Sequence, residues 1–222
     1  MGRSDLLRRW VLANTVGEVL GLGGTGLLAW LVVGRSGEPS AVGAVLGAFA
    51  VAVASGAVEA TVVGLLQHRA VHPWLPALTR RAWWWATLWG ALTAYVLGYL
   101  PSTVISLVSV SDDGQAVSEP PQWVVLAAAA GLGVVAGAVL AWAQALALRH
   151  HVARAGRWVP ANMLAWGVGM PVVFLGMDLA FREGGVARTV GVVVATLTVT
   201  GAVVGVINGS FLCRMVLPRV DP

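Results

Sequence analysis

The sequence predicts an all-α protein, a polytopic transmembrane bundle of six helices. Hydrophobic residues make up 58% of the 222-residue chain and charged residues only 11%, whereas soluble domains carry about a quarter charged residues. Six long apolar stretches follow one another, and each supplies the roughly 20 residues that a helix needs to span a bilayer. Lipid is therefore the expected solvent, and we predict a single transmembrane domain over residues 1–222.

The predicted spans are set by the apolar stretches and by the polar segments between them. They cover residues 10–33, 41–66, 83–104, 122–148, 158–181 and 186–212. The first stretch follows arginines, as in a secretory signal, but it lacks an A-x-A cleavage pattern before Arg35, so we expect a retained helix. Residues 105–121 form the longest predicted loop, and Pro171 is expected to bend the fifth span.

All 14 basic residues are arginines, and their placement predicts the topology. Eleven lie on one side of the predicted spans: Arg3, Arg8, Arg9, Arg69, Arg80, Arg81, Arg149, Arg154, Arg157, Arg214 and Arg219. Because cytoplasmic loops carry the excess of positive charge, both termini are expected in the cytoplasm. A chain rich in alanine, glycine and arginine and free of lysine is typical of a high-GC bacterium, which favours the inner membrane.

Two weak patterns recur three times along the chain. The odd-numbered spans open with a tryptophan and carry a polar residue four positions later: Trp10 and Asn14, Trp83 and Thr87, Trp158 and Asn162. The even-numbered spans end with small residues and then an amide: Ala60, Gly64 and Gln67; Gly137, Ala141 and Gln144; Gly201, Gly205 and Asn208. We therefore predict three tandem two-helix hairpins, over about 8–67, 80–147 and 156–214, with approximate threefold pseudosymmetry.

The small residues and the tryptophans have structural interpretations. Rows of small residues let helix backbones approach closely, so they predict packing faces. Tryptophans near the span ends, Trp10, Trp83 and Trp158 among them, are expected at the headgroup level. Trp89, Trp142 and Trp166 lie deeper, where they either pack or line a cavity.

Glu18 and Glu59 are the two acidic residues deep within the predicted spans, whereas Asp178 lies near the outer end of the fifth span. At 1.5 Å rise per residue, both lie on the order of 10 to 12 Å from the cytoplasmic ends. Asn14 shares a face of the first helix with Glu18, and Ser55 shares a face of the second with Glu59. No arginine lies at this depth, so burial and mutual repulsion disfavour two ionised carboxyls. Such a pair indicates proton coupling or cation binding, or else a hydrogen bond between two helices.

The recurring polar residues are expected to form a ring at the cytoplasmic end of the bundle. With Thr87, its members are Asn14, Gln67, Gln144, Asn162 and Asn208. Amides at this position either coordinate a solute or an ion or bond across helices. Together with Glu18 and Glu59, they are the candidate binding and coupling residues.

Other kinds of site have little support in the sequence. His68 and His72 are one helical turn apart and His150 and His151 lie at the same end, but no cysteine or carboxylate accompanies them, so no metal site is predicted. The G-x-S-x-G, H-E-x-x-H and phosphate-loop motifs are absent, and a catalytic role is not expected. No cofactor is predicted.

Two functions remain open. The first is a small-solute or ion transporter, or the membrane subunit of one, with Glu18 and Glu59 as its binding or coupling site. The alternative is a non-catalytic membrane scaffold that assembles with a larger membrane complex through its small-residue helix faces. The lipid bilayer is the expected environment in both cases, and nucleic acid is not an expected partner.

Overall fold

The structure is a computed structural model that describes residues 2–33, 41–111, 120–182 and 185–217. These residues form six long helices and one short 3-10 helix. The elements are α1 (Arg3–Val33), α2 (Val42–Val71), α3 (Arg80–Ser111), α4 (Gln122–Leu148), η1 (Ala155–Arg157), α5 (Trp158–Ala180) and α6 (Val186–Val216). No strand occurs in the described ranges, so the prediction of an all-α chain with six long helices is confirmed for this part of the chain.

Five of these helices, α2 to α6, are long and apolar enough to cross a membrane. Their outer surfaces carry large hydrophobic side chains, such as Trp142 at 67% exposure and Phe181 at 67%. Soluble monomers rarely expose extended apolar surfaces, because water disfavours them. The five helices therefore indicate a membrane-embedded protein. The helix α1 is 31 residues long and carries Glu18 within it.

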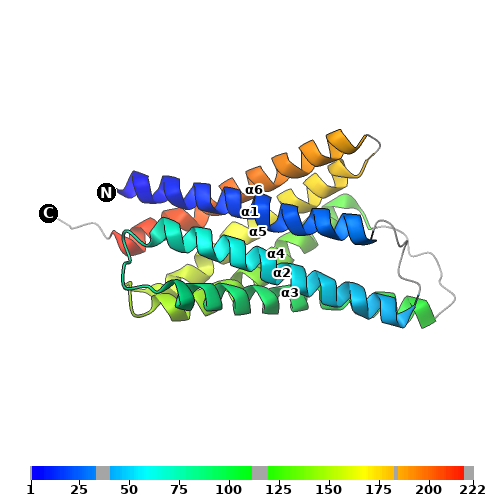
Figure 1. The fold of residues 1–222 in the computed structure, drawn as a ribbon, viewed down its shortest axis with the longest axis horizontal. Helices are drawn as coiled ribbons and strands as arrows, with labels where there is room; N and C mark the ends of the chain where they lie inside the picture. The colour runs from blue at the N-terminus through cyan, green and yellow to red at the C-terminus, as the bar shows by residue number, and fades with distance from the viewer. Residues whose placement is uncertain (1, 34–40, 112–119, 183–184, 218–222) are drawn as a thin grey trace.

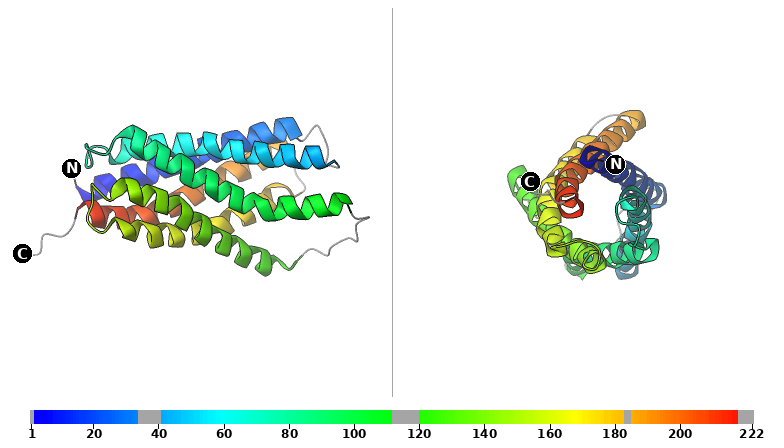
Figure 2. Two further views of the ribbon diagram at one scale, coloured as in Figure 1. Left: turned by 90° about the horizontal axis from the view of Figure 1, so that it is seen from below. Right: turned by 90° about the vertical axis from the view of Figure 1, so that its left-hand side faces the viewer.

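The helices form a ring in chain order (Figure 2). Each helix packs against the helices before and after it, and α1 packs against α6 to close the ring. Successive helices run in opposite directions, so both termini lie at one end of the bundle, together with the α2–α3 and α4–α5 connections (Figure 1). We call this the terminal end and the opposite one the distal end.

Arginines are concentrated at the terminal end. The described arginines there are Arg3, Arg8, Arg9, Arg69, Arg80, Arg81, Arg149, Arg154, Arg157 and Arg214. Those at the distal end are Arg182 and Arg188. The remaining two arginines of the sequence, Arg35 and Arg219, lie outside the described residues. The helix bounds thus separate the arginines as the sequence predicted.

Small residues of the even-numbered helices lie where neighbouring backbones approach closely. A Cβ atom added at Gly201 of α6 would lie 2.6 Å from the Cα atom of Thr15 in α1. One added at Gly137 of α4 would lie 2.5 Å from the carbonyl oxygen of Asn162 in α5. The predicted packing role is therefore confirmed at these glycines, and the faces that carry them are occupied within the chain.

Several helices run past the predicted span ends. The helix α3 continues to Ser111, so part of the predicted loop over 105–121 is helical, and residues 112–119 lie outside the described residues. The predicted span ends were placed where the apolar residues stop. A helix can continue beyond that point through polar residues, as long as its backbone hydrogen bonds continue. Pro171 lies inside α5, as Pro101 does inside α3, and the bend at Pro171 stays a prediction.

Substituting Gly201 by alanine is expected to destabilise the bundle by about 1–3 kcal/mol, because the added methyl group must displace the α1 backbone. Thermal unfolding of the purified protein in detergent measures this effect. Gly191→Ala in the same helix is the matched control, since a Cβ atom there meets nothing within 4 Å. Equal melting temperatures for the two variants would contradict the close α1–α6 approach.

Candidate functional site

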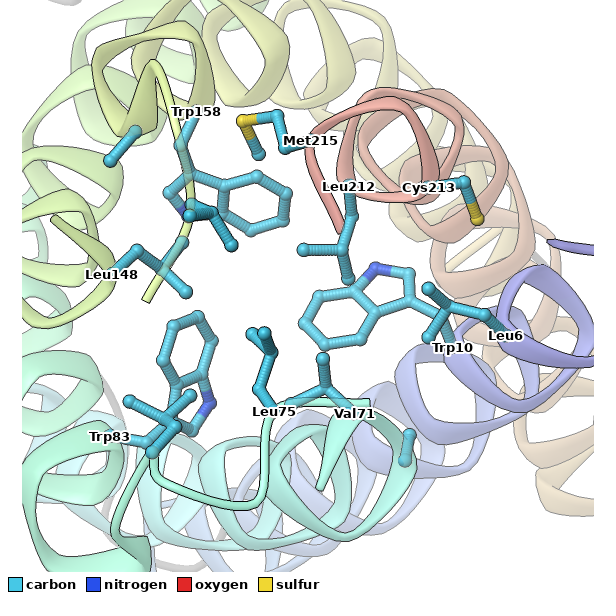
Figure 3. Close-up of a cluster of buried hydrophobic side chains, with 14 of the residues drawn as sticks. Leu6, Trp10, Val71, Leu75, Trp83, Leu148, Trp158, Leu212, Cys213 and Met215 are labelled. Atoms are coloured by element: carbon cyan, nitrogen blue, oxygen red, sulfur yellow. The ribbon is translucent and has the colours of Figure 1, made fainter. Parts of the chain in front are cut away.

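Three tryptophans meet on the axis of the bundle at its terminal end (Figure 3). Trp10 of α1, Trp83 of α3 and Trp158 of α5 are each at most 1% exposed. Their ring centroids are 6.3 Å apart for Trp10 and Trp83, 5.7 Å for Trp10 and Trp158, and 6.4 Å for Trp83 and Trp158. We call them the tryptophan triad. The headgroup position expected for these residues is wrong, because their indoles pack against one another inside the ring rather than against lipid.

Each triad tryptophan lies one helical turn before a polar side chain that bonds back to it. The Asn14 Nδ2 atom donates to the Trp10 carbonyl oxygen at 2.8 Å, and the Asn162 Nδ2 atom donates to the Trp158 carbonyl oxygen at 2.9 Å. The Thr87 hydroxyl donates to the Trp83 carbonyl oxygen at 2.9 Å. This local bond fixes each side chain against its own helix and leaves its oxygen free to accept a further bond.

Amides of the even-numbered helices make that further bond. The Gln67 Nε2 atom donates to Asn14 Oδ1 at 2.9 Å, and the Asn208 Nδ2 atom donates to Asn162 Oδ1 at 3.1 Å. The Gln144 Nε2 atom donates to Thr87 Oγ1 at 3.0 Å. All six side chains are buried, and we call them the amide network. The structure thus brings together the ring that the sequence predicted.

The amide oxygens accept hydrogen bonds from the triad. The Trp10 Nε1 atom donates to Asn208 Oδ1 at 2.8 Å, and the Trp158 Nε1 atom donates to Gln144 Oε1 at 2.8 Å. The Trp83 Nε1 atom is buried and has no hydrogen-bond partner among the described residues. The triad and the amide network therefore form one hydrogen-bonded unit with a single indole donor left over.

A small polar cavity lies beside the amide network. Its volume is about 30 Å³, comparable to the share of liquid volume that one water molecule occupies. The amide network, Glu18 and Glu59 line it, together with Ala60, Val63, Ala91, Leu140 and Trp166. The residues that line it include no arginine or histidine. Of the three deep tryptophans, only Trp166 lines this cavity, whereas Trp89 and Trp142 are exposed on the outside of the bundle.

Glu18 of α1 and Glu59 of α2 line the same cavity where these two helices pack together. A Cβ atom added at Gly21 would lie 3.0 Å from the Cα atom of Glu59, so the two backbones are close one turn beyond Glu18. Glu18 is 1% exposed, and its Oε2 atom has no hydrogen-bond partner among the described residues. The two predicted carboxyls therefore share one cavity without a positive charge in its lining.

Tyr95 of α3 is a site residue that the sequence analysis missed. Its hydroxyl donates a hydrogen bond to Glu59 Oε2. A Cβ atom added at Gly56 would lie 2.7 Å from the Tyr95 ring, so this glycine makes room for the aromatic side chain. Ser55, the expected neighbour of Glu59, instead donates to the Ala52 carbonyl oxygen of its own helix at 2.7 Å. A tyrosine within the third predicted span was the only signal available in the sequence.

The histidines lie apart from this site. The His68 Nε2 atom lies 2.9 Å from the Leu78 carbonyl oxygen, and the ring stacks on His72. His150 accepts a hydrogen bond from the Arg149 side chain at 2.9 Å. Within the described ranges, no three His, Cys, Asp or Glu side chains come together as a metal site. These contacts connect helix ends and loops at the terminal end.

Comparison with known proteins yields no relative. No protein-family model, no curated protein and no solved structure matches the chain. The function is therefore argued from the geometry of the cavity and of the residues that line it.

Replacing Gln144 by leucine is expected to destabilise the protein by about 1–3 kcal/mol, because the Trp158 indole N–H would stay buried without an acceptor. Thermal unfolding in detergent measures the loss. The matched control is Gln122→Leu, the same substitution at the exposed start of the same helix. An unfolding temperature for Gln144→Leu equal to that of the control would show that the amide network contributes nothing to stability.

Proposed function

We propose that the protein transports a small ion or solute across a membrane, alone or as a membrane subunit, and that Glu18 and Glu59 form its binding or coupling site. The observation that carries this proposal is a polar cavity with two acidic residues and no positive charge in its lining. A carboxyl inside hydrocarbon costs about 2.5–3.5 kcal/mol on insertion scales, so a protein retains it for a function. The small cavity favours an ion over a larger solute. A scaffold would need neither the cavity nor the carboxyls.

The proposed transport unit is a bundle of six spans, with α1 as the sixth, built from three similar hairpins. Support for the hairpin repeat comes from bonds that recur. In each hairpin, the odd-numbered helix bonds back to its tryptophan carbonyl and accepts a bond from the even-numbered helix. Support for α1 as a span comes from its place in the ring between α2 and α6.

We infer that the arginine-rich terminal end faces the cytoplasm and that the membrane is a bacterial inner membrane. The excess of arginine at this end follows the charge bias of cytoplasmic loops. With both termini on that side, the number of spans is even. A protein partner is a further possibility, and it would need a face other than the glycine rows that already pack inside the bundle.

Cysteine labelling tests this orientation. The native cysteine is first replaced by serine, and single cysteines are then introduced as His151→Cys at the terminal end and Arg182→Cys at the distal end. In intact bacterial spheroplasts, a membrane-impermeant maleimide is expected to label Arg182→Cys, and to label His151→Cys only after the membrane is permeabilised. The reverse pattern would overturn the proposed orientation, and labelling of both sites in intact spheroplasts would contradict a crossing of the membrane by α5.

Ion flux into proteoliposomes tests the transport proposal. A potassium diffusion potential drives the flux, which is followed with an internal pH dye and, separately, with an internal sodium indicator. Protein-containing vesicles are expected to take up one of these ions faster than empty vesicles. The Glu18→Gln/Glu59→Gln variant should lose most of this flux, because it removes the charge that binds the ion.

The control for this measurement is Asp178→Asn, which changes an exposed carboxyl that pairs with Arg182 at 2.7 Å near the distal end. This variant should transport as the unchanged protein does. Two results would overturn the proposal: vesicles with protein that match empty vesicles for both ions, or a double glutamine variant that keeps the full flux.

A further inference from the structure

We propose that the ion held in the cavity is a proton shared between Glu18 and Glu59, rather than a metal cation. This inference takes its role in transport from the proposed function, but occupancy of the site by a proton is separately measurable. The inference starts from Glu18, which lines the cavity. Its Oε2 atom is buried and has no hydrogen-bond partner among the described residues. A buried polar atom of this kind needs a partner, because an unmade bond leaves its desolvation uncompensated.

The oxygens around the cavity suit a proton better than a metal cation, because most of them already accept hydrogen bonds. Hard cations such as Ca²⁺ and Mg²⁺ take six or more oxygen ligands. The network oxygens Asn14 Oδ1, Asn162 Oδ1, Asn208 Oδ1, Gln144 Oε1, Gln67 Oε1 and Thr87 Oγ1 each accept a hydrogen bond from an N–H group, which leaves each at most one lone pair for an ion. Of the carboxyl oxygens, Glu59 Oε2 accepts from Tyr95 and Glu18 Oε2 has no partner among the described residues, and a proton needs no more than two acceptors. The volume of about 30 Å³ leaves room for about one water molecule beside it.

The charges that face the pair allow one ionised carboxyl. Glu18 comes from α1 and Glu59 from α2, while α3 contributes Tyr95, with Tyr99 one turn further on. The lining residues from α4, α5 and α6 are Leu140, Gln144, Asn162, Trp166 and Asn208, none of which titrates. Glu18 is buried and Glu59 is half-buried, so two like charges here repel each other with little screening, and a shared proton removes one of them. The neutral carboxyl then donates its O–H to the ionised one, directly or through one water.

Tyr95 is a positioning residue for this pair. Its hydroxyl donates to Glu59 Oε2, which stabilises negative charge on Glu59 and turns Glu18 into the donor of the shared proton. Gly56 and Gly21 allow this arrangement, because a Cβ atom at either position would collide with Tyr95 or with the Glu59 backbone. The proton therefore has a defined resting place between a donor on α1 and an acceptor held by α3.

Infrared difference spectroscopy of the protein in lipid vesicles tests the inference. A protonated carboxyl has a C=O stretching band distinct from that of a carboxylate, and we expect one such band to persist at pH 7. Both Glu18→Gln and Glu18→Gln/Glu59→Gln should lose the band, whereas Asp178→Asn should keep it. In Tyr95→Phe, the band should shift in frequency, because the hydrogen bond to Glu59 is gone while the pair remains.

Two results would overturn the proton assignment. One is the absence of a protonated carboxyl band at pH 7 in the unchanged protein, with melting temperatures confirming that it is folded. The other is loss of the band when sodium chloride replaces N-methylglucamine chloride, since a metal cation would then displace the proton. Sodium flux without proton flux would leave the transport proposal intact and overturn the proton assignment. A persistent band without any flux would support the shared proton and overturn the transport proposal.

Discussion

Polar groups inside the bundle are shut off from bulk water and find no hydrogen-bond partner in lipid tails, and this constraint organises the terminal half of the molecule. Six side chains from six helices satisfy one another, and two indoles add their N–H groups to the same unit. Hydrogen bonds between membrane helices contribute modestly one at a time, about 0.6 kcal/mol on average in one measured case. Their number and their shared oxygens, rather than the strength of any one, fix the helices around a common axis.

Much of the site could be predicted because polar residues stand out in apolar stretches. Glu18, Glu59 and the amides were recognised as unusual within predicted spans, and helical spacing placed Asn14 and Glu18 on one face. The pairing across helices was not predictable, since nothing local connects Asn208 to Trp10, which lies 198 residues away. Tyr95 was missed because a tyrosine in a membrane helix is common, and its bond to Glu59 depends on how α2 and α3 pack. The triad was misplaced because indoles favour headgroups unless a bundle offers them partners.

The three pairs of consecutive helices differ in what they contribute to the cavity. All three supply members of the amide network, whereas both carboxyls come from the first hairpin and the tyrosine from the next helix. The network therefore carries a structural task that all three pairs of helices share. The acidic pair, which only α1 and α2 supply, breaks that equivalence. The pair lies deeper in the bundle than the triad, whose indoles lie on the axis at the terminal end (Figure 3).

The contact between α1 and α6 differs from the other five contacts of the ring, because its two helices are not neighbours along the chain. Because α1 is made before α6, the Trp10 indole lacks its acceptor until the last helix of the chain is present. Only the arrival of α6 supplies Asn208 and the glycines that accept the α1 backbone. The contacts that bury the polar face of α1 can therefore form only after nearly the whole chain has been made.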